Sequence, residues 1–136
     1  MQRLKTRAQF QVVLAGTIIA KTSHFALHRN ALNVKASPVQ SGKQTDAPML
    51  FREQDMWIGA MVPKRWAKRA ATRNAIKRQI YTVSAEFSPE YSQAAFVIRL
   101  RSSFARAEFV SAVSDQLKQA VRAEIQSLMQ AGAKVS

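Results

Sequence analysis

The chain reads MWIGAMVPKRWAKRAATRNAIKRQIYTVSAEFSP from Met56 to Pro89, and this stretch decides the fold class. Its first residues are apolar and end at Pro63, which is typical of a buried strand. From about Arg69 the apolar residues recur at helical spacing, so we expect a helix that runs to Phe87 and stops at Ser88-Pro89. A strand followed by an amphipathic helix predicts a sheet covered by helices.

Other segments fit the same layered arrangement. A capping box formed by Thr6 and Gln9 predicts a first helix that ends near Gly16. Alternating residues over 24–32 predict a strand with two different faces, and the apolar run over 94–100 predicts a buried strand. A last helix is expected over 105–129, capped by Ser103, with the apolar stripe Phe109, Val113, Leu117, Val121, Ile125 and Leu128.

The elements together predict a single domain over residues 1–136, because a chain of this length holds one core. We expect an α+β layer sandwich with a mixed four-stranded sheet in the order αβββαβα. Residues 35–55 are rich in Ser, Pro and Gly, which predicts a long loop or hairpin tip, and the extra strand is expected in this region. The C-terminus is expected to fray from about residue 130.

The composition limits the class of protein. Lys and Arg number 21 against 8 Asp and Glu, which gives a formal charge of +13, and 47% of residues are hydrophobic, enough for a core. The chain has no cysteine, which excludes disulfides and thiolate zinc sites. No segment approaches the roughly 18 apolar residues of a membrane span, and the interrupted N-terminus does not fit a signal peptide. We therefore expect a cytoplasmic protein.

The charge is concentrated in the helix and the loop before it. No acidic residue lies between Met56 and Ala85. Solvated helix faces usually mix charges of both signs, so an acid-free face indicates an anionic partner, most often a nucleic-acid backbone. A basic membrane-surface protein has a similar charge balance, and a merely solvated face is the plain alternative. The cations are Lys64, Arg65, Lys68, Arg69, Arg73, Lys77 and Arg78.

A more specific pattern lies within the charge. Val62-Pro63-Lys64-Arg65 precedes the helix, which carries Arg73-Asn74-Ala75-Ile76-Lys77-Arg78. This arrangement resembles the signature of the bacterial ribonuclease P protein subunit, whose fold is like the second domain of ribosomal protein S5, and the resemblance covers nearly the whole chain. Ala75 and Tyr81 depart from it, since the family usually has Arg at both positions, and the loop over 35–55 is longer than typical.

The resemblance implies a protein that assists a catalytic RNA in removing the 5′ leader of precursor tRNA. The implied partners are that RNA, in a 1:1 complex, and the leader. The resemblance also implies that Mg²⁺ serves the ribonucleoprotein. On the protein itself we expect no cofactor, metal site, catalytic residue or obligate protein partner. The surface for the catalytic RNA is implied at Lys64, Arg65, Lys68, Arg69, Arg73, Asn74, Lys77 and Arg78. A leader cleft between the first helix and the sheet is implied at Phe10, Leu14, Ala26, His28, Ala60, Arg73 and Asn74.

The residues by themselves leave alternatives open. Phe10 alone is more typical of core packing, and His28 alone of a surface histidine. His24 and His28 are expected on one strand face, but no third metal ligand is evident, and Trp57 and Trp66 are expected in the core and at its boundary. A ribosomal or assembly protein is the alternative function. A DNA-binding architectural protein is disfavoured, because the helix lacks a helix-turn-helix context.

Overall fold

The computed structural model describes residues 1–32, 51, 54–104 and 115–135. After a short first strand, the elements follow the predicted order αβββαβα. The sheet has five strands rather than four, because the N-terminal residues add a strand that pairs with the edge of the sheet. The elements are β1 (Gln2–Arg3), α1 (Arg7–Leu14), β2 (Thr17–Lys21), β3 (Phe25–Asn30), β4 (Trp57–Met61), α2 (Ala70–Phe87), β5 (Ala95–Leu100) and α3 (Asp115–Ala133).

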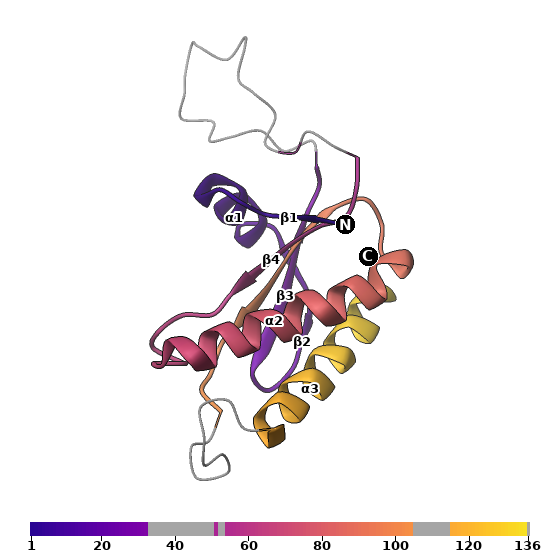
Figure 1. The fold of residues 1–136 in the computed structure, drawn as a ribbon. Coiled ribbons are helices and arrows are strands. Elements are labelled where there is room, and N and C mark those ends of the chain that lie inside the picture. Colours follow the sequence, from indigo (N-terminus) through magenta and orange to yellow (C-terminus); the bar gives the residue numbers. More distant parts are fainter. Residues whose placement is uncertain (33–50, 52–53, 105–114, 136) are drawn as a thin grey trace.

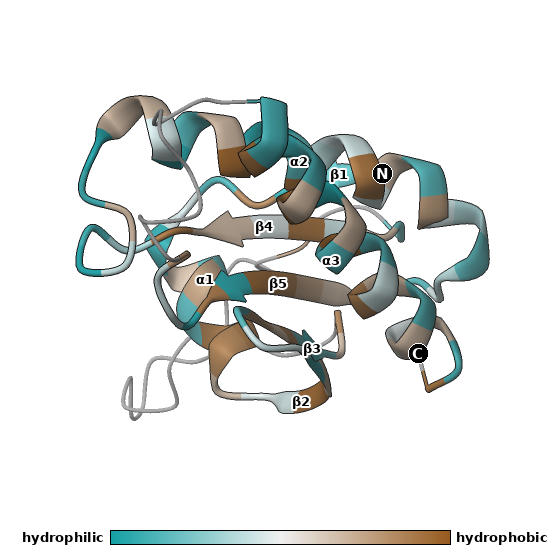
Figure 2. Cartoon of the chain, turned by 90° about the horizontal axis from the view of Figure 1, so that it is seen from below, coloured by the Kyte–Doolittle hydropathy of each residue, from teal (hydrophilic) through white to brown (hydrophobic). Residues whose placement is uncertain are grey.

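The strands form one mixed sheet in the order β1-β4-β5-β3-β2 (Figure 1). β4 runs parallel to β1 and β5, whereas β3 is antiparallel to β5 and β2. A parallel pair needs a crossover connection, which α2 supplies between β4 and β5. β5 therefore lies at the centre of the sheet, as its apolar sequence predicts, and Figure 2 shows that it is largely hydrophobic.

α2 and α3 pack over one face of the sheet and enclose the main core (Figure 1). Phe25 of β3 and Phe96 of β5 are fully buried there against Ile80 of α2 and Ile125 of α3. The predicted bounds of α2 are confirmed, since the helix ends at Phe87 and a 3₁₀ turn over Ser88–Glu90 follows. We call this side of the sheet the helix side.

α1 packs on the other face, which we call the α1 side. The predicted capping box is confirmed: the backbone N–H of Gln9 donates to Oγ1 of Thr6 at 3.2 Å, and that of Thr6 donates to Oε1 of Gln9 at 3.1 Å. Val13 is fully buried in a second apolar cluster. The chain then turns at Gly16, where a Cβ atom would collide with the carbonyl oxygen of Arg29, so the close approach to β3 requires glycine.

β2 is a strand that the sequence pattern did not predict. Its register against β3 shifts between Ile18 and Ala20, which marks a bulge. A bulge interrupts the alternation of side chains between the two faces of a strand. The neighbouring residues Ile18 and Ile19 therefore gave no alternating pattern in the sequence. β2 supplies the third strand of the predicted order αβββαβα. Most of the loop region over 35–55, where the extra strand was expected, lies outside the described residues.

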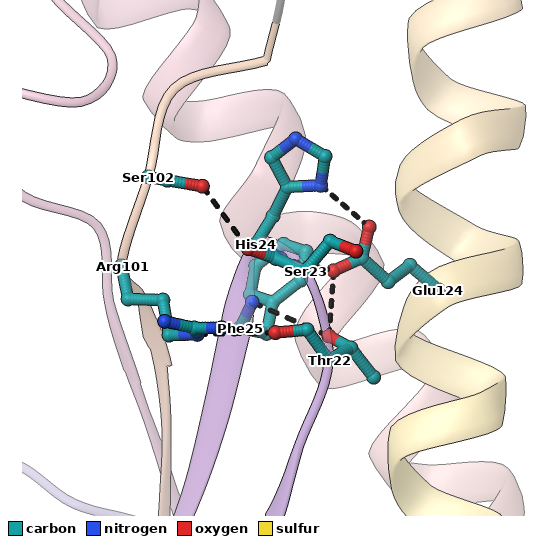
Figure 3. Close-up of polar contacts among 7 residues, drawn as sticks. All are labelled: Thr22, Ser23, His24, Phe25, Arg101, Ser102 and Glu124. Carbon is teal, nitrogen blue, oxygen red and sulfur yellow. Dashed lines mark hydrogen bonds and ion pairs between the residues drawn. The ribbon is translucent and has the colours of Figure 1, made fainter.

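The turn between β2 and β3 is held by α3 (Figure 3). Glu124 accepts hydrogen bonds from the hydroxyl of Thr22 and the backbone N–H of His24, both at 2.6 Å, and its other oxygen lies 2.8 Å from Nδ1 of His24. Arg101, just after β5, donates through Nε to the carbonyl of Thr22 at 3.0 Å. His24 therefore contacts the helix side and does not share a strand face with His28, contrary to the prediction.

α3 carries the predicted apolar stripe as far as it is described. Leu117, Val121, Ile125 and Leu128 are buried, while Phe109, Val113 and the predicted start of the helix lie outside the described residues. α3 continues to Ala133, beyond residue 130, from which fraying was expected. Gly132 packs so closely that a Cβ atom there would lie 2.5 Å from Cδ2 of Leu27 and from the hydroxyl of Tyr91.

Candidate nucleic-acid interface

α2 carries its cations on the side away from the sheet. Ile76, Ile80 and Val83 are buried in the main core, so the opposite side of the helix is exposed to solvent. Within the part of the chain that the structure describes, none of the cations there forms an ion pair with a carboxylate. We call this uncompensated surface the α2 face; its exposed side chains are Lys64, Arg65, Lys68, Arg69, Asn74, Lys77 and Arg78.

The loop before α2 is anchored by an aromatic residue. The carbonyl of Pro63 accepts hydrogen bonds from the backbone N–H groups of Trp66 and Ala67, both at 3.1 Å. Trp66 is half-buried against the main core, as expected for a boundary residue, and the guanidinium of Arg65 lies 5.3 Å from its ring centroid. The anchored ring therefore leaves Lys64 and Arg65 on the outside of the loop.

Arg73 has a different position from the other predicted contacts, because it is half-buried. Its Nη1 donates to the carbonyl of Ala67 at 3.1 Å and to that of Lys68 at 2.9 Å. These bonds tie the first turn of α2 to the loop that precedes it. Arg73 thus orients the cations of the loop, with one of its nitrogens already committed to the protein.

Arg3 extends the positive surface, and sequence reasoning missed it. Its guanidinium lies 4.1 Å from the ring centroid of Tyr81 on α2, which is a cation–π contact. The hydroxyl of Tyr81 in turn accepts the backbone N–H of Ala60 in β4 at 3.2 Å. The α2 face therefore continues across β1 at the edge of the sheet. No sequence pattern marks this contact, because it depends on the pairing of β1 with β4.

Phe10 and Leu14 lie on the α1 side, where both are half-buried against the second apolar cluster. The ring of Phe10 lies directly over β4: a Cβ atom at Gly59 would lie 2.6 Å from Cε1 of Phe10. Trp57 is buried in the same cluster, as expected, and makes an edge contact with Phe51. Phe10 is therefore a packing residue that keeps part of its ring accessible.

His28 lies on the α1 side, opposite Phe25 and Leu27, as the strand alternation predicts. It is only 5% exposed, so the alternative of a surface histidine is wrong. Burial and, secondarily, the guanidinium of Arg99 lower the pKa of His28 from its usual 6.5. Nε2 of His28 accepts a hydrogen bond from Nε of Arg99 at 3.1 Å. Sequence reasoning missed Arg99, although it is the one charged residue in the otherwise apolar β5.

Three of the predicted cleft residues do not lie on the α1 side. Ala60 is buried in the main core on the helix side, because the alternation of β4 places Trp57, Gly59 and Met61 on the α1 side. Arg73 and Asn74 belong to α2, which covers the helix side. The structure therefore brings Phe10, Leu14, Ala26 and His28 to one face and separates Ala60, Arg73 and Asn74 from them.

The described residues do not assemble a metal site of protein ligands. Over residues 1–32, 51, 54–104 and 115–135, no group of three His, Cys, Asp or Glu side chains comes close enough to hold an ion. Among the helices described, none is long and apolar enough to cross a bilayer. What the described surface offers is positive charge together with partly exposed apolar groups.

A protein family and several solved structures are similar to this chain. The model of the family described as ribonuclease P matches residues 1–131. No curated protein matches the chain. Among solved structures, the RNase P protein of Staphylococcus aureus is similar with a TM-score of 0.62 and 15% identity, over 96% of this chain and 94% of that one. The RNase P protein from Thermotoga maritima is similar with a TM-score of 0.61 and 15% identity, over 96% of each chain.

Proposed function

Because the chain belongs to the ribonuclease P family, as the protein component of this tRNA-processing ribonucleoprotein, we propose that it helps a catalytic RNA to remove the 5′ leader of precursor tRNA. The observation that carries the proposal is the α2 face. It presents a dense set of cations without a carboxylate partner among the described residues. Such a surface is favoured beside an anion, and a phosphate backbone offers a row of anions at fixed spacing.

The protein associates with the RNA of ribonuclease P, and the α2 face is the surface that docks on it in a 1:1 complex. Lys77 and Arg78 contact phosphates directly, since both are exposed and point away from the core. Arg73 holds the loop that carries Lys64 and Arg65. Mg²⁺ is bound with the RNA, which carries out the hydrolysis of the phosphodiester.

The leader of precursor tRNA lies on the α1 side of the sheet, and this binding broadens the range of substrates. Single-stranded RNA is held by aromatic or apolar platforms beside positive charge. The half-buried ring of Phe10 and the side chain of Leu14 are the platforms that support this proposal. His28 is too deeply buried to stack on a base, so its part is to hold Arg99.

The test is cleavage of precursor tRNA by the catalytic RNA at low magnesium concentration, with and without this protein. We expect cleavage to be faster with the protein, because its cations replace part of the charge screening that magnesium supplies. No stimulation at any protein concentration would rule out the proposal. Phe10→Ala should then weaken the binding of precursor tRNA more than that of mature tRNA. An equal loss of affinity for both would mean that the leader does not bind on the α1 side.

A further inference from the structure

One row of residues crosses four strands on the α1 side of the sheet. Lys21 of β2 pairs with Ala26 of β3, Ala26 pairs with Arg99 of β5, and Arg99 pairs with Met61 of β4. Residues paired across strands point to the same face. The row therefore brings two cations, Lys21 and Arg99, onto the side that α1 covers only in part.

Arg99 is fixed in this row by His28. Nε2 of a buried imidazole can accept the hydrogen bond from Nε of Arg99 only when the ring is neutral, with its proton on Nδ1. A guanidinium that uses Nε in this way still has the four N–H groups of its two Nη atoms. These groups form a fork that suits a phosphate or carboxylate oxygen pair.

No carboxylate of the described residues forms an ion pair with the Nη groups of Arg99. Arg99 takes part in none of the ion pairs formed there. Asp55 pairs with the N-terminal ammonium, and Glu86 and Glu124 contact groups on the helix side. A half-buried guanidinium that has no counter-charge among the described residues is costly to the fold, so an anion on this face is favoured.

The surroundings of the row favour RNA as the source of that anion. Ile18, which pairs with His28, is 43% exposed, and Met61 is half-buried, so apolar surface that can contact the faces of bases flanks the cations. β4 ends at Met61, and the chain continues through Pro63 to Lys64 of the α2 face. A strand of RNA that follows the row past Met61 would thus continue toward Lys64 of the α2 face.

We propose that Arg99 binds a backbone phosphate of single-stranded RNA lying on this row, with Lys21 as a flanking contact and His28 as the positioning residue that holds the guanidinium. The inference deepens the proposed function and rests on it. The guanidinium of Arg99 is the group that binds the backbone of the leader, and the buried His28 has a role that does not require contact with RNA.

The test uses the protein reconstituted with the catalytic RNA and measures the binding of precursor tRNA and of mature tRNA. Arg99→Gln should weaken the binding of precursor tRNA about tenfold, as expected for one charge-assisted hydrogen bond, and leave mature tRNA nearly unchanged. Arg122→Gln is the matched control, since it removes the same charge from α3, where Arg122 pairs with Glu86 at 2.7 Å. The control should not change the ratio between the two substrates.

His28 is tested through its partner. His28→Leu removes the acceptor and should weaken precursor binding a few-fold, whereas His28→Gln keeps an acceptor and should restore much of it. In an Arg99→Gln background, His28→Leu should have no further effect on the ratio, because the two residues act as one unit. If His28→Leu changes this ratio as much in the Arg99→Gln background as it does alone, the positioning role is overturned.

Two outcomes separate this inference from the proposed function. If the wild-type protein fails to stimulate the catalytic RNA, the proposed function fails. If it stimulates but Arg99→Gln binds both substrates like Arg122→Gln, or loses both equally, the row does not hold the leader and the inference is overturned. Should Arg99→Gln not fold, Lys21→Gln replaces an exposed side chain of the same row, and precursor binding equal to wild type would overturn the inference.

Discussion

The two faces of the sheet are built from the same strands but from different kinds of residue. On the helix side, Phe25, Phe96 and Ile98 are fully buried beneath α2 and α3. On the α1 side, the same strands carry His28 and Arg99. The helix side therefore holds the larger apolar core, while the α1 side combines the second apolar cluster with polar groups.

The largest expected effect tests this difference between the helix side and the α1 side. Phe96→Ala should lower the free energy of unfolding by about 3–5 kcal/mol, because it leaves a cavity in the main core. Phe10→Ala on the α1 side should cost less, since its half-buried side chain removes less apolar surface from water. Urea denaturation of both variants measures the two values. An equal or larger loss for Phe10→Ala would break the contrast between the faces.

Two glycines give a second comparison with a smaller effect. Gly132→Ala should destabilise the protein by about 1–3 kcal/mol, because its Cβ would press on Tyr91, whose hydroxyl is fixed by a 2.6 Å hydrogen bond to the carbonyl of Met129. Gly59→Ala meets the outer atoms of the Phe10 ring and Cδ1 of Leu4, which are the ends of side chains that can shift. Thermal unfolding should therefore rank Gly132→Ala as the more harmful change, and the reverse order would mean that the α1 side is the more rigid.

Charge removal from the α2 face should affect binding and leave stability almost unchanged. Lys77→Ala combined with Arg78→Ala should reduce the slope of log K against log salt by about 2, because each of the two cations neutralises one phosphate. The free energy of unfolding should change by no more than about 0.5 kcal/mol, as for other exposed positions. We choose this pair over Arg73, whose bonds to the loop would confuse the two readouts.

The control for that pair is Lys118→Ala combined with Arg122→Ala, which removes the same charge from α3. Binding of the catalytic RNA is measured by titration at several salt concentrations. An equal drop in slope for both pairs would mean that the protein attracts RNA through its total charge. The α2 face would then be no more than a solvated surface.

The smallest expected effect is the pH dependence of stability on the α1 side. Because the pKa of His28 is lowered in the folded state, the unfolded chain binds more protons between that pKa and 6.5. The contribution of neutral His28 is therefore complete above 6.5 and is lost as the pH falls through this window. The pKa of Asp55 is lowered too, but from 3.8, so it acts at lower pH.

The measurement is the free energy of unfolding at about pH 7.5 and about pH 5, from urea denaturation. His28→Gln has no proton to gain, so its stability should fall less than that of the wild type over this range. Arg99 is the charged group that contacts His28 directly, and Lys21 lies on the neighbouring strand, paired with Ala26 and not with His28. Equal losses for the two proteins would show that His28 is protonated as readily in the folded state as in the unfolded one.

The parts of the fold that were predictable depend on local signals. The capping box of Thr6 and Gln9 and the stop at Ser88-Pro89 act within a few residues, so they set the bounds of α1 and α2 from the sequence alone. Helical spacing likewise predicted which side chains of α2 are exposed, because it places the cations on a different side of the helix from Ile76 and Ile80.

The rest depends on contacts between distant residues. β1 is defined only by its pairing with β4, and the Arg3–Tyr81 contact follows from that pairing. The resemblance implied a cleft position for Ala60, but the pairing of β4 with β5 places it on the helix side. His28 and Arg99 are 71 residues apart, and only the pairing of β3 with β5 brings them together.

The hydrogen bonds of Glu124 also have a consequence for the synthesis of the protein. Thr22 leaves the ribosome 102 residues before Glu124, whose carboxylate holds the turn between β2 and β3. β5, which lies between β3 and β4 in the sheet, is also synthesised after both of these strands. At about 5–20 residues per second, the first hairpin waits for roughly 5–20 seconds with one strand edge unpaired. A nascent chain is therefore open to misassociation until α3 has emerged, and truncation before residue 124 should leave a product that depends on chaperones.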